Sequence, residues 1–249
     1  FIRCLPLVGS LMKIQRPEKI SFEKINALAK KYRALIVKLE LKEADKKLLL
    51  AHGFRRDSWP LLPTKTIYID LTKSLKQLRQ EISKETRYCL RQAEQAGGEI
   101  KRIRNLEKFY ANFRKFGKGY VPRPTELQAL VEAFGKDAIL LSVDQLAGTL
   151  ILIHDKTAYY YFAFTSPLGR KKFAQHFLVW QAIKLAKELG CKIFDLEGIE
   201  DPRYKITRKW HGFSHFKKSF GGSEVEYRKP VKKLFLKHVF GFGKHQKFI

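Results

Sequence analysis

The stretch YYYFAFTSPLGRKKFAQHFLVWQAIKLAKELGCKIFDLEGI, residues 159–199, decides the fold of this 249-residue chain. Its aromatic beginning predicts a strand over 158–165. Apolar residues at helical spacing then predict a helix over 173–189, which ends at Gly190 because glycine commonly follows the last helical turn. A short apolar run over 192–196 predicts a second strand. The stretch is therefore a strand, a helix and a strand in direct succession.

Two more strands are predicted just upstream, over 138–143 and 147–153, joined by tight polar turns. The order of three strands, a helix and a strand resembles that of the GNAT superfamily of acyltransferases. This resemblance implies that the helix packs on a mixed sheet and that two strands splay apart to hold an acyl group. We therefore expect an α+β fold.

The beginning of the chain has a similar order of elements. LPLVGSLMKIQRP (5–17), a helix over 21–33 and the strand ALIVKLEL (34–41) parallel the later unit, and the letters HGF follow both copies, at 52–54 and at 211–213. We expect tandem GNAT-like domains, of which the first is truncated at its N-terminus. The expected organisation is a remnant of the first domain in 1–62, a second domain in 63–226 and a basic, aromatic-rich tail in 227–249.

Charge sets this chain apart from an average globular protein. It has 50 Lys and Arg against 24 Asp and Glu, a formal net charge of +26, spread along the whole length. Such a field attracts polyanions such as tRNA, phosphorylated precursors or an anionic membrane surface. An organism with basic proteins throughout would give the same balance, so charge alone selects no partner. No run is long and apolar enough to span a bilayer, and we expect a cytoplasmic protein.

The segment from Ser74 predicts one long helix that begins with a capping box to Gln77 and ends at Gly97-Gly98. An apolar stripe is expected along Leu75, Leu78, Ile82, Cys89, Ala93 and Ala96. The opposite side carries Lys76, Arg79, Lys84, Arg87 and Arg91. This basic side is either a surface for tRNA phosphates or an ordinary solvated face.

Three ordered motifs resemble the FemABX family of peptidoglycan aminoacyltransferases. The first is SKETRYCLRQAEQAGGEI (83–100), preceded by a strand that contains Pro63, Thr66, Asp70 and Leu71. It departs from the family pattern at Cys89, where Asn is usual. The second is the stretch 159–199, and the third is GFSHFKKSFGGSEVEY (212–227). The resemblance implies transfer of an amino acid from aminoacyl-tRNA to the amine of a peptidoglycan precursor peptide, with no cofactor.

The resemblance also implies site residues. A Lys that follows Phe in the third motif is implicated in stabilising the transition state, and it corresponds to Lys217 after Phe216. Asp195, at a strand end, is a candidate to act as a base, to orient the amine or to cap the next turn. The expected substrate-binding residues are Phe216, Tyr159, Tyr161 and Arg170. No metal site is expected, since neither the cysteines nor His176, His211 and His215 have a metal-ligand spacing.

Two other functions remain open. A CoA-dependent N-acyltransferase would need glycines where its helix begins, so that the backbone can approach the pyrophosphate. Here Arg170 is present but Phe173 stands in the place of a glycine, which disfavours CoA. A non-catalytic RNA-binding protein would also keep this fold and charge. The tail from Tyr227 has seven Lys and Arg and no acid; it can lie on an anionic membrane, pack on the first domain or bind RNA.

Overall fold

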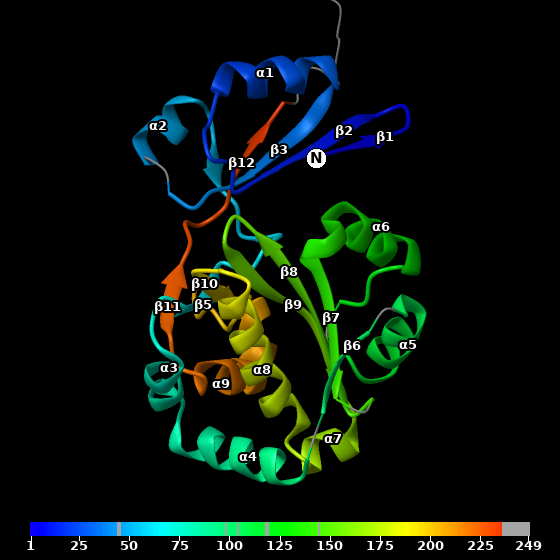
Figure 1. Ribbon diagram of the computed structural model, residues 1–249. Helices are drawn as coiled ribbons and strands as arrows, with labels where there is room; N and C mark the ends of the chain where they lie inside the picture. The colour runs from blue at the N-terminus through cyan, green and yellow to red at the C-terminus, as the bar shows by residue number, and fades with distance from the viewer. Residues whose placement is uncertain (44–45, 98, 104, 118–119, 144, 236–249) are drawn as a thin grey trace, which may run out of the picture. The chain divides into compact units, whose positions relative to one another are not determined.

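The chain forms two compact units in the computed structural model, which describes residues 1–43, 46–97, 99–103, 105–117, 120–143 and 145–235 (Figure 1). One unit is Lys65–Val225. The other is Phe1–Thr64 together with the segment from Glu226 on. Each unit has a sheet and a hydrophobic core of its own.

The larger unit is built on a sheet with the order β11-β5-β10-β9-β8-β7-β6. Strands β7 to β9 are the three consecutive antiparallel strands that the sequence predicts, and β6 pairs antiparallel with β7. Strand β10 runs parallel to β9 and antiparallel to β5. The mixed sheet expected of a GNAT-like protein is therefore present. The strands are β5 (Lys65–Asp70), β6 (Ile100–Arg102), β7 (Ala138–Val143), β8 (Ala147–His154), β9 (Thr157–Thr165), β10 (Ile193–Asp195) and β11 (Ser223–Glu226).

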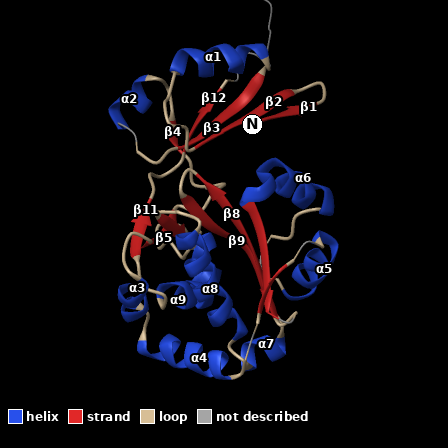
Figure 2. Ribbon diagram, viewed as in Figure 1, coloured by secondary structure: helices blue, strands red, loops and turns tan. Residues whose placement is uncertain are grey.

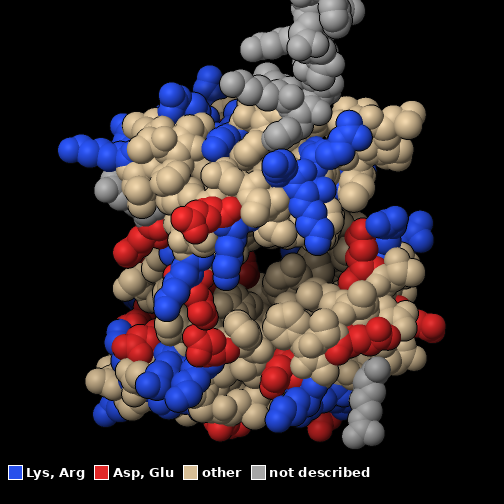
Figure 3. Space-filling model, turned by 90° about the horizontal axis from the view of Figure 1, so that it is seen from above, with Lys and Arg blue, Asp and Glu red and all other residues tan. Residues whose placement is uncertain are grey.

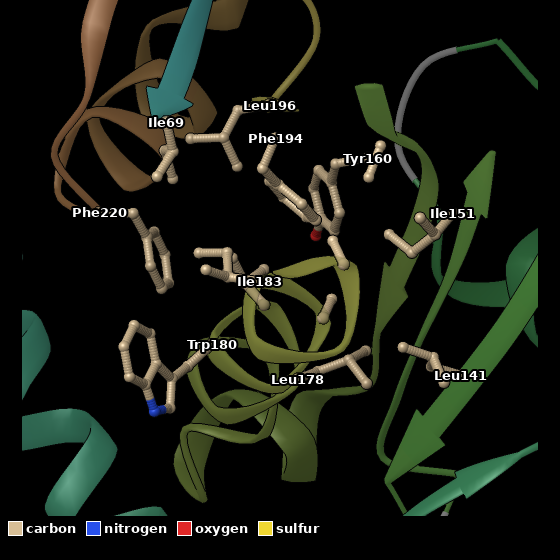
Figure 4. Close-up of a cluster of buried hydrophobic side chains, with 14 of the residues drawn as sticks. Ile69, Leu141, Ile151, Tyr160, Leu178, Trp180, Ile183, Phe194, Leu196 and Phe220 are labelled. Atoms are coloured by element: carbon tan, nitrogen blue, oxygen red, sulfur yellow. The ribbon is translucent and has the colours of Figure 1, made fainter. Parts of the chain in front are cut away.

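Helices cover both faces of this sheet (Figure 2). Helix α8 (Ala174–Glu188) packs on one face, where Ile183 lies toward Phe194 and Leu178 toward Leu141, while Trp180 lies beside Phe220 (Figure 4). Helices α5 (Leu106–Phe116) and α6 (Pro124–Phe134) pack on the other. Neighbouring strand residues belong to different cores, as Leu140 and Leu141 do, because successive side chains of a strand point to opposite faces. The predicted strand–helix–strand unit is thus β9, α8 and β10.

The single long helix predicted from Ser74 is wrong. The structure has α3 (Leu75–Glu81) and α4 (Lys84–Gln95), separated by extended backbone at Ile82 and Ser83. The capping box of Ser74 and Gln77 is present, but Ser83 begins a second helix by accepting a hydrogen bond from the N–H of Thr86. The break turns the apolar face, so that Leu90 is buried whereas Cys89 is only partly buried.

The smaller unit contains the second copy of the predicted strand–helix–strand unit. Strand β2 (Gly9–Gln15), helix α1 (Phe22–Lys31) and strand β3 (Ala34–Glu40) follow one another, and β2 pairs with β3 in parallel. The HGF letters do not continue the repeat. Residues 52–54 follow α2 (Lys46–Ala51) and bury Phe54, whereas 211–213 begin α9 (His211–Lys218) and expose Phe213. The shared letters therefore have different structural roles.

The chain returns to the smaller unit at its end. Strand β12 (Val231–Leu234) pairs with β3 on one side and with β4 (Arg55–Arg56) on the other, in a sheet ordered β1-β2-β3-β12-β4 that begins with β1 (Ile2–Leu5). Val231 and Phe235 pack against the core of this unit. Three positions were open for the tail: on a membrane, on the first domain or on RNA. Residues 227–235 pack on the smaller unit, which contains the N-terminal part of the chain, and 236–249 lie outside the described residues. No helix in the described part of the chain has the length and apolarity needed to cross a membrane.

Candidate active site

The candidate site lies where β9 and β10 part. Their parallel pairing has only three residue pairs and ends with Asp195 opposite Tyr159, after which β9 continues to Thr165 without β10. Beyond Asp195 the chain stays along β5, where the N–H groups of Leu196 and Ile199 donate to the carbonyl oxygens of Ile67 and Lys65, and it no longer pairs with β9. Two strands that splay in this way expose backbone and side chains between them. This is the feature that the GNAT-like order predicts.

Asp195 is held in place by two donors at this point of divergence. Its side chain is buried, on the face of β10 opposite the fully buried Phe194. The Thr66 hydroxyl donates to Oδ1 of Asp195, and the N–H of Glu197 donates to the same oxygen at 2.7 Å. These bonds fix the turn that follows. The structure thus gives Asp195 a capping contact as well as a place beside the site.

Glu197 is a site residue that the sequence analysis missed. It is partly buried, and its φ of 60° lies in the left-handed region, which side-chain-bearing residues seldom adopt. Its negative charge acts to raise the pKa of Lys217, Tyr161 and Tyr159. The sequence holds one signal for Glu197: it lies two residues after Asp195, and side chains two residues apart along a strand lie on the same face.

Lys217 comes to this cluster from α9, whose last turn carries it. Its Nζ donates a hydrogen bond to the carbonyl oxygen of Gly198 at 2.8 Å and lies 5.0 Å from the centroid of the Phe213 ring. Burial lowers the pKa of Lys217 to about 8, and the charges of Glu197 and Asp195 act in the opposite direction. A lysine with such a pKa can hold or release a proton near neutral pH.

Three tyrosines complete the cluster. Tyr159 and Tyr68 lie on either side of Asp195 in the sheet register. Burial raises the pKa of Tyr159, and the charge of Asp195 adds to the effect. Tyr161 is exposed and occupies a β-bulge, since Leu150 pairs with Phe162 and Ile151 with Tyr160. The bulge aims Tyr161 away from the core.

Tyr160 belongs to the core instead. Its hydroxyl accepts a hydrogen bond from the Gln175 side chain, and burial raises its pKa well above the usual range. Of the three consecutive tyrosines, Tyr159 and Tyr161 therefore border the site and Tyr160 packs inside.

Two predicted substrate-binding residues lie apart from this cluster. Phe216 packs against the core, with ring centroids 5.0 Å from His176 and 5.2 Å from Phe220. Arg170 lies on α7 (Pro167–Lys171) and donates to the carbonyl oxygen of Thr165 at 3.1 Å. Thr165 is six residues beyond Tyr159 along β9, roughly 15–20 Å at the rise of a strand. Arg170 therefore lies away from the Lys217 cluster.

The five cations predicted to bind tRNA do not form one free face. Arg79 makes a bidentate ion pair with Glu94, with both N–O distances at 2.8 Å. Arg87 donates to the carbonyl oxygens of Gln80 and Ile82 and so satisfies the broken end of α3. Lys76, Lys84 and Arg91 are exposed. Figure 3 shows that Lys and Arg are interspersed with Asp and Glu over the displayed face.

The helix that would receive CoA phosphates begins at Phe173, which has a φ of 53°. This backbone conformation favours glycine, yet the chain places a large ring there that packs partly against the core. In the described part of the chain, no group of three or more His, Cys, Asp or Glu side chains could hold a metal ion. The site is thus made of carboxylates, tyrosines and one lysine.

The segment that carries Asp195, Glu197 and Lys217 is similar to a known protein family. Residues 123–239 match the FemAB family. This segment is therefore similar to the FemAB family. It runs from the start of α6 beyond β12 and includes Asp195, Glu197 and Lys217, so it confirms the resemblance that the motifs predict. No curated protein sequence matches the chain.

Solved structures share the fold of this chain. FemX is 16% identical, with a TM-score of 0.77 over 94% of this chain and 83% of its own. A C-terminal domain of a putative lysylphosphatidylglycerol synthetase from Agrobacterium fabrum is 14% identical, with a TM-score of 0.56 over 95% and 80%. A fungal GCN5-related glucosamine N-acetyltransferase region is 11% identical, with a TM-score of 0.51 over 93% and 30%. These likenesses confirm the expected fold.

Proposed function

We propose that this protein is an acyltransferase that moves an amino acid from aminoacyl-tRNA to the amine of a peptidoglycan precursor peptide, in the synthesis of cell-wall cross-bridges. The observation that carries the proposal is Lys217, partly buried beside Glu197 and Asp195 where β9 and β10 part, within the FemAB segment. Because such donors and precursors are made in the cytoplasm, we place the protein there.

The donor ester is already activated, so the site has to align two reactants and manage charge and protons. The acceptor nitrogen attacks the ester carbonyl carbon, and the carbonyl oxygen becomes an oxyanion. The Lys217 ammonium has donor hydrogens beyond the one that contacts Gly198, and it stabilises that oxyanion.

Proton transfers then complete the reaction. Glu197 accepts a proton from the attacking amine, and Lys217 gives a proton to the ribose oxygen as the ester C–O bond breaks. The products are an amide and a free ribose hydroxyl. Lys217 regains its proton from Glu197, whose charge lies beside it. Asp195 holds the turn that places Glu197, and Tyr159 and Tyr161 line the approach.

One assay tests the reaction against its rivals. The protein is incubated with labelled aminoacyl-tRNAs, labelled acyl-CoA and purified precursor, and label is followed into the peptide. We expect label from tRNA and none from CoA. Transfer only from CoA would overturn the proposal, and RNA binding without transfer from either donor would favour a non-catalytic protein.

A matched pair of variants tests the assigned lysine. Lys217→Met should remove most transfer, whereas Lys218→Met should not. Lys218 is the neighbouring residue on α9, but its Nζ is exposed and pairs with Glu224 at 2.5 Å. If both variants transfer at the wild-type rate, Lys217 has no part in the chemistry.

A further inference from the structure

The segment that links Asp201 to Lys217 has an unusual composition that the proposed chemistry does not explain. Residues 202–218 contain six Lys and Arg and no Asp or Glu. The segment includes a 3-10 helix, η2 (Lys205–Trp210), which continues directly into α9. Trp210 and Phe213 lie at this junction. A basic surface with aromatic side chains interleaved is typical of proteins that bind single-stranded nucleic acid.

Buried polar contacts fix this segment in place. Asp201 is fully buried and accepts a bidentate ion pair from Arg203, with the closest N–O distance at 2.7 Å. The buried Thr207 hydroxyl donates to the carbonyl oxygen of Asp201 at 2.8 Å. The Ser214 hydroxyl donates to the carbonyl oxygen of Trp210 and accepts from the N–H of Glu200, both at 2.7 Å. These bonds hold the outer side chains of the segment on a rigid base.

The outer side chains are cations and apolar groups. Lys205, Arg208 and Lys209 are exposed, and none of them forms an ion pair with another described residue. Ile206 and Phe213 are exposed as well, and the Trp210 ring packs on the Phe213 ring at a centroid distance of 5.7 Å. Two of the five cations on α3 and α4 differ in this respect, since Arg79 and Arg87 are engaged within the protein.

This surface leads directly to the candidate site. Phe213 and Lys217 are four residues apart on α9, one helical turn, and the Lys217 Nζ lies 5.0 Å from the Phe213 ring centroid. The Phe213 ring thus lies between the exposed cations of η2 and Lys217 along the chain. The two helical segments, at about 2.0 and 1.5 Å per residue, give a track of roughly 20 Å.

We propose that residues 205–213 bind the single-stranded 3′ end of the donor RNA, and we rest this on the proposed function. Lys205, Arg208 and Lys209 contact phosphates, while Trp210 and Phe213 stack on bases and guide the terminal ester to Lys217. Stacking accepts any base, so the surface holds the 3′ end common to different donors. Lys76, Lys84 and Arg91 then serve only the duplex part of the RNA.

Fluorescence anisotropy with two labelled RNA hairpins tests this surface without any transfer reaction. One hairpin has a single-stranded 3′ overhang and the other is blunt. The wild-type protein should prefer the overhang. The triple variant K205A/R208A/K209A should bind the overhang hairpin at least about tenfold more weakly and with a shallower salt dependence, because each lost phosphate contact lowers the slope by about 0.7.

Two further variants separate the contributions. Trp210→Ala should reduce the preference for the overhang and leave the salt slope unchanged. The matched triple variant K76A/K84A/R91A should weaken both hairpins equally and keep the preference. Thermal melts of each variant show whether it is folded.

The results distinguish failure of the surface from failure of the reaction. If K205A/R208A/K209A is folded and keeps the wild-type preference for the overhang, this proposal is overturned, whatever the transfer assay gives. Loss of binding to anionic phospholipid vesicles with unchanged RNA binding would overturn it in favour of a membrane surface. If the overhang preference is lost as expected but the wild-type protein transfers no amino acid, the surface stands and the proposed reaction fails.

Discussion

Lys217 donates a hydrogen bond from its Nζ to the carbonyl oxygen of Gly198, which is 2.8 Å away and lies three residues beyond the end of β10 at Asp195. This bond joins the last turn of α9 to the turn that follows β10. Burial lowers the pKa of Lys217 to about 8, although the charges of Glu197 and Asp195 act in the opposite direction.

The protonation state of Lys217 should make the transfer rate depend on pH. If the ammonium form of Lys217 acts on the oxyanion and the leaving group, the transfer rate should fall as pH rises through about 8. Lys217→Arg should keep some activity and lose this alkaline decline, because the guanidinium stays protonated. Initial rates between pH 6 and 10 measure both. An alkaline limb that is unchanged in the arginine variant would assign the titration to another group.

Glu197→Gln should lower the transfer rate by about 10- to 100-fold, since a general base contributes rate factors of this order and above. The charge of Glu197 raises the pKa of Lys217, so its removal should also move the alkaline decline below pH 8. Both effects appear in the same pH–rate profile. A melting temperature close to that of the wild type is required, and an unmoved profile would place Glu197 outside the reacting cluster.

His176 should make the protein sensitive to acid. Burial lowers its pKa to about 4, and its Nδ1 has no hydrogen-bond partner among the described residues. The unfolded chain then binds the proton more tightly, so stability falls as pH decreases from 6.5 towards 4, by on the order of 2 kcal/mol. His176→Phe keeps the contacts with Phe216 and Phe220. Urea denaturation at pH 7 and pH 5 should show a smaller loss for this variant than for the wild type.

Gly222→Ala should destabilise the larger unit by about 2–4 kcal/mol. Gly222 has a φ of +83°, and an added Cβ would lie 2.5 Å from the carbonyl oxygen of Tyr68. Gly212→Ala is the control, because α9 leaves open space at that position. It should be neutral or stabilise by up to about 1 kcal/mol. Equal midpoints of urea denaturation for the two variants would contradict the close approach at Gly222.

Local patterns predict most of the fold. The meander, α8 and the capping box at Ser74 depend on residues that are close in sequence, and all are present in the structure. The break at Ile82 depends on a distant contact, in which the N–H of Ser83 donates to the carbonyl oxygen of Ser219 at 2.8 Å. The spacing of apolar residues within 74–96 contains no information about a contact with residue 219, so the sequence predicts one helix where the structure has two.

The candidate site is predicted less completely. The motifs indicate Lys217 and Asp195, and the structure brings the two together. Glu197 joins them because its backbone has a positive φ, which few residues with a side chain adopt and which the motifs do not predict. The position of Tyr68 opposite Asp195 follows from sheet register, and that of Tyr161 from a bulge. Both depend on pairing between strands far apart in sequence. Arg170 is near in sequence to the predicted helix start and distant in space from Lys217.

The placement of β12 between β3 and β4 constrains the order in which this protein can mature during synthesis. The larger unit is one continuous stretch and is complete once residue 225 has left the ribosome. The sheet of the smaller unit lacks an inner strand until residues 231–234 emerge, so its first strands wait through the synthesis of the whole larger unit. Nascent chains arrested just before residue 231 should therefore resist protease within 65–225 and be cleaved within 1–64.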